Sequence, residues 1–299
     1  MIIAKALTKK FDGITALDSI NLTIPEGCIY GLVGSNGSGK STLLRLISGV
    51  YMADDGEITV GGERSFNNPP IKSQIAFLGD TPYFLAQSDL KEMADLYSNM
   101  YPDFDYDIYN HLLTIFPLDQ KARLSTFSKG MQRQAALILA LSTNPKYLLM
   151  DEAFDGLDVV MRRVLSNIVM DGVEKRGMTA IIASHNLREL ENVCDNLCVI
   201  HEGKIISSGD IESLRGNIHK VQAAFSEVPD ISAFDGLDIM KTERTGSLLS
   251  LVVKGNQDEI MQFINTLNPL YAECIEPTLE EVFIYELEVY GYDVKNILS

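Results

Sequence analysis

The sequence predicts an α/β protein: a mostly parallel sheet with an antiparallel β element, an inserted helical subdomain and a small C-terminal α+β domain. Three observations support this fold class. Short apolar runs alternate with helical periodicity between residues 28 and 200, which is typical of a doubly wound sheet. A glycine-rich run separates one of these apolar runs from the helix that follows. Two stretches, 82–126 and 216–299, leave the alternation and indicate additional parts of the molecule.

Composition and charge limit the class of protein. The chain has 299 residues, 46% of them hydrophobic and 22% charged, as in an ordinary globular protein. Its apolar stretches fall short of the roughly 20 residues of a membrane span, and its first residues lack a signal-like pattern, so we expect a cytosolic protein. The net charge of −16 argues against a nucleic-acid partner, because binding to phosphates needs a basic surface. We expect reduced, buried thiols rather than a zinc site at Cys28, Cys194, Cys198 and Cys274.

The N-terminal part is predicted to be strand-rich. Alternating apolar positions favour strands over 2–7 and 18–24, with a turn signal at Asp12 between them, and these strands begin the antiparallel element. Further strands are expected over 56–60 and 75–78, after the glycine run and its helix.

The remaining elements divide the chain into two domains. Apolar residues recur with helical spacing from about 82 to 126, which predicts the inserted helical subdomain, and a helix is expected over 128–141. Past about residue 215 the pattern changes to short strands and helices, with 14 acidic and 5 basic side chains. We therefore expect a main domain over 1–215 and an accessory domain over 216–299, whose acidic charge is interpreted as a solvated surface rather than a cation site.

The glycine-rich run from Gly34 to Thr42 predicts a P-loop, a site for nucleotide phosphates. Glycines let the backbone curl so that successive N–H groups and the helix N-terminus face an anion. Lys40 is expected to reach the β- and γ-phosphates, and the Ser41 hydroxyl to be a magnesium ligand. The motif alone leaves ATP and GTP open. The candidate nucleotide-binding residues in the run are Ser35, Asn36, Gly37, Ser38, Gly39, Lys40, Ser41 and Thr42.

Two carboxylates end a later apolar strand, Tyr147–Met150. Asp151 and Glu152 follow it directly, which places both at the carboxyl edge of the sheet, where open α/β folds bind ligands. Asp151 is expected to hold magnesium, and Glu152 to polarise an attacking water. An incidental strand end is the alternative, but the position downstream of a phosphate loop favours a catalytic site.

A short motif before the 128–141 helix connects these features to a known family. Phe127-Ser-Lys-Gly-Met131 resembles the Leu-Ser-Gly-Gly-Gln signature of ATP-binding cassette (ABC) ATPases, retaining Ser128 and Gly130. In that family the signature binds the γ-phosphate held by the opposite subunit, which suits a hydroxyl and bare N–H groups. The alternative interpretation of Ser128 is an ordinary helix N-cap.

Other family landmarks follow in order across residues 1 to about 210. Phe11 matches the aromatic residue that stacks on adenine, although a core phenylalanine is the alternative. Asp155–Asp158 matches the D-loop, and His185 matches the switch histidine that contacts the γ-phosphate. Asp80 stands where the family usually has a glutamine; it is either a magnesium ligand or a plain loop carboxylate.

The resemblance implies an ATP-binding and ATP-hydrolysing subunit that uses ATP and Mg²⁺ and energises a separate transmembrane permease. Because each composite site borrows a signature, it implies a homodimer or heterodimer held at the inner face of the cell membrane. The tail Pro277–Phe283 is similar to the ending of exporter-type ATPases of the drug, antibiotic-peptide and lipid groups. Tyr83, Phe84 and the aromatic stretch 97–104 are either a permease-docking surface or subdomain core. The alternatives are a soluble ABC-type ATPase and an ATP-gated regulatory module.

Overall fold

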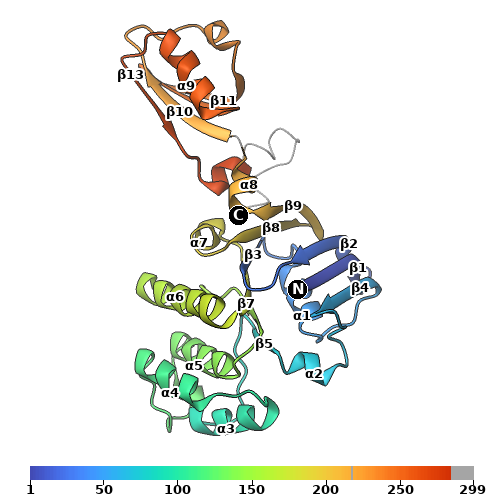
Figure 1. The fold of residues 1–299 in the computed structure, drawn as a ribbon. Coiled ribbons are helices and arrows are strands. Elements are labelled where there is room, and N and C mark those ends of the chain that lie inside the picture. The colour runs from blue at the N-terminus through green and yellow to red at the C-terminus, as the bar shows by residue number, and fades with distance from the viewer. Residues whose placement is uncertain (217, 284–299) are drawn as a thin grey trace. The chain divides into compact units, whose positions relative to one another are not determined.

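The chain folds into two units, Met1–Gly209 and Asp210–Ser299, in a computed structural model that describes residues 1–216 and 218–283. Figure 1 labels their helices and strands. Within these described residues, no helix has the length and apolar character needed to cross a membrane.

A six-stranded sheet forms the centre of the first unit. The strands β5, β6, β7, β3 and β8 pair in parallel, and β9 lies at the edge beyond β8. The central strands are buried on both faces, which is why they appear in the sequence as continuous apolar runs. In sheet order the strands are β5 (Ile75–Leu78), β6 (Tyr147–Asp151), β7 (Thr179–Ser184), β3 (Ile29–Val33), β8 (Asn196–His201) and β9 (Lys204–Asp210).

A separate antiparallel sheet packs beside the central one. Its order is β2 (Ile14–Ile24), β1 (Ile2–Phe11) and β4 (Asp55–Val60). One hydrophobic core joins its inward side chains to α1 (Lys40–Ile47) and to one face of the central sheet. The antiparallel element expected from the sequence is therefore part of the main fold.

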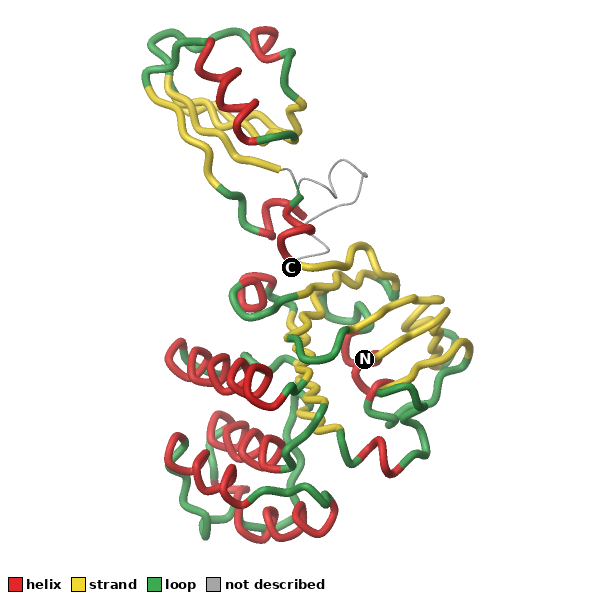
Figure 2. The backbone as a smooth tube through the Cα atoms, in the orientation of Figure 1, coloured by secondary structure: helices red, strands yellow, loops and turns green. Residues whose placement is uncertain are grey.

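Helices cover the opposite face of the central sheet, as Figures 1 and 2 show. α3 (Leu90–Met100) begins with a reciprocal capping box between Asp89 and Glu92, and α4 (Tyr106–Ile115) begins at Asp105. These two helices form the inserted helical part and pack on α5 (Lys129–Ser142). The other helical elements of this unit are α2 (Pro69–Lys72), η1 (Leu124–Thr126), α6 (Val159–Arg176) and α7 (Leu187–Glu191).

The second unit is an antiparallel sheet with one main covering helix. Apolar residues of the strands pack against α9 (Gln257–Thr266) and against Phe225 and Phe234, whose rings meet edge to face. The sheet order is β11 (Asp238–Thr245), β12 (Leu248–Lys254), β10 (Ile218–Ala224) and β13 (Tyr271–Ile275). Two short helices complete the unit, α8 (Ile211–Arg215) and η2 (Ile231–Phe234). Residues 279–283 are helical, and the rest of the helix expected after Pro277 lies outside the described residues.

Candidate functional site

Three neighbouring strand ends define one edge of the central sheet. β7 lies between β6 and β3, and the register pairs Asp151 with Ala183 and Val33 with Ser184. Because the three strands are parallel, the segments that follow them emerge at the same edge. Those segments begin at Gly34, Glu152 and His185.

The phosphate loop holds its lysine against its own carbonyl groups. Lys40 is 5% exposed, and its Nζ donates to Gly34 O at 2.5 Å and to Ser35 O at 3.2 Å. Nζ also lies 3.6 Å from Glu152 Oε1. Burial lowers the pKa of Lys40, and the attraction of Glu152 opposes this effect. The result is a desolvated positive charge at the mouth of a glycine loop, which suits an anionic phosphate.

The glycines of this loop meet different surroundings. A Cβ added to Gly34 would lie 2.1 Å from Ile200 O, and one added to Gly39 would lie 2.7 Å from Ala16 O. A Cβ on Gly37 would meet no atom within 4 Å, although its φ of +83° still favours glycine. The first two glycines therefore let the loop pack against the protein behind it, whereas Gly37 faces open space.

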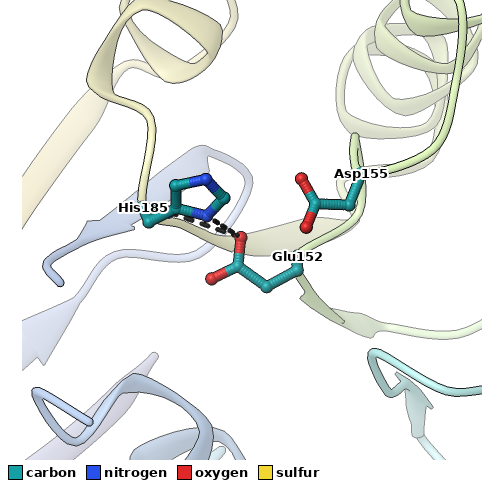
Figure 3. Close-up of side chains that lie close together, drawn as sticks. All are labelled: Glu152, Asp155 and His185. Atoms are coloured by element: carbon teal, nitrogen blue, oxygen red, sulfur yellow. Dashed lines mark hydrogen bonds and ion pairs between the residues drawn. The ribbon is translucent and has the colours of Figure 1, made fainter. Parts of the chain in front are cut away.

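Glu152 is fixed at both its backbone and its carboxylate. Its φ is +50°, in the left-handed region, and its N–H donates to Ala183 O at 2.9 Å. Glu152 Oε2 lies 2.9 Å from His185 Nδ1 and accepts a hydrogen bond from the His185 backbone N–H at 3.3 Å (Figure 3). One carboxylate oxygen thus faces Lys40 and the other faces His185, an arrangement suited to a base with a fixed orientation.

Asp155 lies beside this pair. Ligand atoms of Glu152, Asp155 and His185 all lie within 4.8 Å of one another. Figure 3 draws these three side chains. A turn brings Asp155 back, because its N–H donates to Glu152 O at 3.1 Å. From the sequence, Asp155 was identified only as the start of the D-loop. Its closeness to Glu152 could have been predicted, because an acidic residue three positions after Glu152 is too near in the chain to lie far from it.

Asp151 and Ser41 have the chemistry that a divalent cation needs. Asp151 is 1% exposed, and its Oδ1 is buried without a hydrogen-bond partner in the described part of the chain. Burial raises the pKa of Asp151, and a hydrogen bond with the Ser41 hydroxyl opposes this effect. An unpaired carboxylate oxygen beside a hydroxyl is the hard donor set that Mg²⁺ prefers.

Asp80 lies elsewhere in the site. It is exposed in the loop after β5 and lines a cavity of about 390 Å³ with Gly130, Arg133 and Asp155. Its charge acts on Arg133 and is not among the charges that shift the pKa of Asp151. Among the described residues, Asp80 is not part of the group formed by Glu152, Asp155 and His185, whose ligand atoms lie within 4.8 Å of one another.

The signature residues begin α5. Ser128 is the N-cap, since its Oγ accepts a hydrogen bond from Met131 N–H at 3.3 Å, and it is exposed. A Cβ added to Gly130 would meet no atom within 4 Å. No hydrogen bond in the described part of the chain joins Ser128 to the phosphate loop. The start of this helix therefore presents an open polar surface.

Phe11 keeps a partly exposed ring near the loop. It ends β1, is 37% exposed, and meets Tyr51 edge to face at a centroid distance of 5.2 Å. The adjacent strand β2 passes close to the loop, because Ala16 O limits the space at Gly39. Lys9 Nζ lies over the ring, 5.2 Å from its centroid, and the exposed part of the aromatic surface suits stacking on a purine.

A second cavity, of about 450 Å³, lies where β5 and the loop after it meet the helices α3 and α5. Asp80, Tyr83, Phe84, Tyr97 and Tyr101 are among the residues that line it. Tyr83 is 82% exposed, whereas Tyr97 and Tyr101 stack at 5.6 Å and burial raises the pKa of both. The aromatic stretch thus contains both exposed and packed rings.

Arg133 is a site residue that sequence reasoning missed. It lies on α5, is 9% exposed, and donates from Nη1 to Asp155 O at 3.0 Å and from Nη2 to the carbonyls of Asp151 and Glu152. The sequence could have indicated this role, because Arg133, Ala136 and Ala140 are spaced by about one helical turn and therefore share a face of α5, which is its buried face.

Comparison with known proteins identifies relatives of the whole chain. A family model described as "ABC transporter" matches residues 17–155. The ABC transporter ATP-binding protein YtrB of Bacillus subtilis (strain 168) is 30% identical over 284 residues, covering 95% of this chain and 97% of the relative. The bacitracin transport ATP-binding protein BcrA of Bacillus licheniformis is 28% identical over 212 residues, covering 70% of this chain and 69% of the relative.

Solved structures share the fold of the first unit. One, described as the structure of an ATP binding subunit of an ABC transporter, superposes with a TM-score of 0.67 at 25% identity. It covers 72% of this chain and 92% of that structure's chain. The aligned share of 72% is close to the share of the chain that the first unit, Met1–Gly209, makes up.

Proposed function

The chain belongs to the family of ABC transporter ATP-binding proteins, which bind and hydrolyse ATP for membrane transporters, and from this premise we propose that it drives export through a separate permease. One observation supports catalysis most directly: Lys40, Glu152 and His185 converge at a single sheet edge. Glu152 and His185 directly follow β6 and β7, and Lys40 begins α1 after the loop that follows β3, so the fold itself assembles the group.

The proposed reaction is hydrolysis of the γ-phosphate. A water molecule attacks the γ-phosphorus while Glu152 takes a proton from that water, and ADP leaves with the β–γ bridging oxygen. His185 fixes the Glu152 carboxylate through Oε2. We assign it a second role, contact with the γ-phosphate. Lys40 stabilises the negative charge on the phosphates, and Phe11 stacks on the adenine ring.

The proposed cation is Mg²⁺, held by Ser41 and Asp151. The unpaired, buried Oδ1 of Asp151 supports this assignment. When bound, Mg²⁺ supplies positive charge to the β- and γ-phosphates. Asp80 is proposed as a further ligand because of its charge alone. Its charge also acts on Arg133, so the two roles of Asp80 are separated by experiment below.

The proposed working unit is a dimer. Ser128 and Gly130 present an open helix start, and the described contacts do not connect Ser128 to the chain's own phosphate loop. We assign these two residues to the γ-phosphate of ATP bound by a second subunit, identical or not. Two ATP molecules then lie between the subunits, and hydrolysis opens the interface by adding charge.

The proposed partner is a multi-span permease at the inner face of the cell membrane. Exposed Tyr83, beside the second cavity, supports docking there. Two features favour export: the Phe127–Met131 signature and the Pro277–Phe283 tail both resemble exporter-type ATPases.

The experiment that tests this proposal is affinity purification of the tagged chain from membranes of its own host in mild detergent. We expect co-purification of one multi-span membrane protein, and ATPase activity of the complex. The Tyr83→Asp variant is the matched control, since it places a charge on the docking surface and should reduce recovery of the partner. A chain that hydrolyses ATP but recovers no membrane protein would instead support the soluble ATPase.

A further inference from the structure

Arg133 joins three backbone positions around the catalytic carboxylate. Its guanidinium reaches the carbonyls of Asp151, Glu152 and Asp155 from the neighbouring helix α5. The side chain is 9% exposed, so these hydrogen bonds lie in a desolvated environment. The planar guanidinium suits this task, because several donors in one fixed plane can bind several carbonyls at once.

The backbone that Arg133 binds is strained. Glu152 is one of the few non-glycine residues with positive φ, at +50°, a conformation that persists only when its surroundings hold it. Three hydrogen bonds hold its backbone here: its N–H donates to Ala183 O, and its carbonyl accepts from Arg133 and from the Asp155 N–H. This φ determines where the carboxylate points, and it points to His185 and Lys40.

Arg133 also lies in the field of nearby carboxylates. Burial lowers the pKa of Arg133, and the attractions of Asp80 and Asp155 are the largest effects that oppose it. Asp80, Arg133 and Asp155 line the same cavity of about 390 Å³. The helix that carries Arg133 begins at Ser128 and Gly130, one turn earlier.

We propose that Arg133 is a positioning residue that transmits the position of the signature helix to Glu152. A shift of α5 moves the guanidinium, which moves the Glu152 carbonyl and reorients its carboxylate. Binding of Ser128 and Gly130 to the ATP of the second subunit is thereby coupled to the orientation of Glu152 in the same chain. This inference rests on the proposed role of Glu152 as the base.

The first test compares Arg133→Met with Arg176→Met. Arg176 also donates to a partner in the fold, Asn144 Oδ1 at 2.7 Å, but none of its described hydrogen bonds reaches the site. We expect Arg133→Met to lower kcat by roughly 10–100-fold, the cost of a small misplacement of a catalytic group, with ATP affinity unchanged within about twofold. Arg176→Met should retain wild-type kcat. A wild-type kcat for Arg133→Met would overturn the proposal.

A second variant covers failure to fold. Arg133→Lys keeps the charge but cannot reach three carbonyls, so we expect a folded protein with an intermediate kcat and unchanged ATP affinity. Unchanged kcat in this variant contradicts the proposal even if Arg133→Met is insoluble.

The third test separates positioning from general stability. In a Glu152→Gln background, single-turnover hydrolysis should change less than about twofold on adding Arg133→Met, because the two residues act as one unit. An equal fold loss in both backgrounds would show that Arg133 acts independently of Glu152. Absence of ATPase activity in the wild-type chain would instead contradict the proposed function, so the two failures are distinguishable.

Discussion

Glu152 Oε2 lies 2.9 Å from His185 Nδ1, and the same oxygen accepts a hydrogen bond from the His185 backbone N–H. The second oxygen of that carboxylate faces Lys40 at 3.6 Å. Glu152 directly follows β6, His185 directly follows β7, and Lys40 begins α1 after the loop that follows β3. The register of β3, β6 and β7 therefore sets where these three groups meet.

Glu152→Gln should preserve this hydrogen-bonded geometry and remove the base. We expect hydrolysis to fall at least about 100-fold while ATP affinity stays within about twofold. The variant should accumulate as an ATP-bound dimer, seen by light scattering at saturating ATP and Mg²⁺. Exposed Glu174→Gln is the control. A monomer under these conditions contradicts the proposed sandwich.

Lys40→Ala should weaken ATP binding. It removes a buried ammonium beside the loop carbonyls, and loss of charge-assisted hydrogen bonds to phosphate costs on the order of 10–100-fold in affinity. Titration calorimetry measures the change, with exposed Lys91→Ala as the matched control. An unchanged affinity in Lys40→Ala would show that the loop does not bind the phosphates.

Mixing two inactive chains should restore activity if the sites are shared. Gly130→Asp places a carboxylate at the open start of α5, where it repels phosphate without a clash. Mixed with Lys40→Ala chains, it forms dimers with one intact composite site, so about a quarter of wild-type activity should return in an equimolar, exchanging homodimer. No recovery, with dimer exchange demonstrated, argues that the sites are not shared between identical chains.

Asp80→Asn tests the remaining cation ligand. If Asp80 contributes to the Mg²⁺ site, the Mg²⁺ concentration for half-maximal hydrolysis should rise by roughly tenfold. Asp103→Asn, an exposed acid of the helical part, is the control. An unchanged Mg²⁺ requirement would assign Asp80 to Arg133 alone.

The three buried thiols, Cys28, Cys194 and Cys198, should be unreactive in the folded chain. Burial raises the pKa of Cys28 to about 11 and that of Cys198 to about 12, and it also raises the pKa of Cys194. Because a thiol is reactive only as thiolate, Cys28 is ionised in about one molecule in a thousand at pH 8, rising tenfold per pH unit. Ellman's reagent at pH 8 should therefore modify only partly exposed Cys274, and all four thiols after denaturation. Rapid modification of Cys28 at pH 8 would contradict its burial.

The fold was predictable where burial leaves a clear pattern. β5 has the predicted bounds and β6 extends one residue further, because strands buried on both faces are continuous apolar runs. β1 continues through the polar residues Lys9 and Lys10 to Phe11, four residues beyond its predicted end. β11 was not predicted at all: this edge strand of the second unit is mostly polar and gains its structure from pairing with β12.

The site was predictable to the level of strand ends. The strand that ends in Asp151 and Glu152 placed both acids at the carboxyl edge of the sheet, since parallel strands end together, whereas His185 was assigned by the family resemblance. In the structure Lys40 and His185 both lie beside Glu152. The positive φ of Glu152 and the reach of Arg133 were not predictable, because both depend on packing between α5 and the β6 end. The location of Asp80 was not predictable either, because only the folded chain shows that Asp80 and Arg133 line the same cavity and that the Asp80 charge acts on Arg133.

The unequal surroundings of the loop glycines affect how inherited variants should be interpreted. A missense allele at Gly34 or Gly39 drives a methyl group into a backbone carbonyl, so it should lower the amount of protein in the cell. A substitution at Gly37 meets no atom within 4 Å and is strained only by its φ of +83°, so it should leave a larger share of the protein present but defective. Immunoblot abundance would therefore separate substitutions in this loop that prevent folding from those that leave a folded but inactive protein.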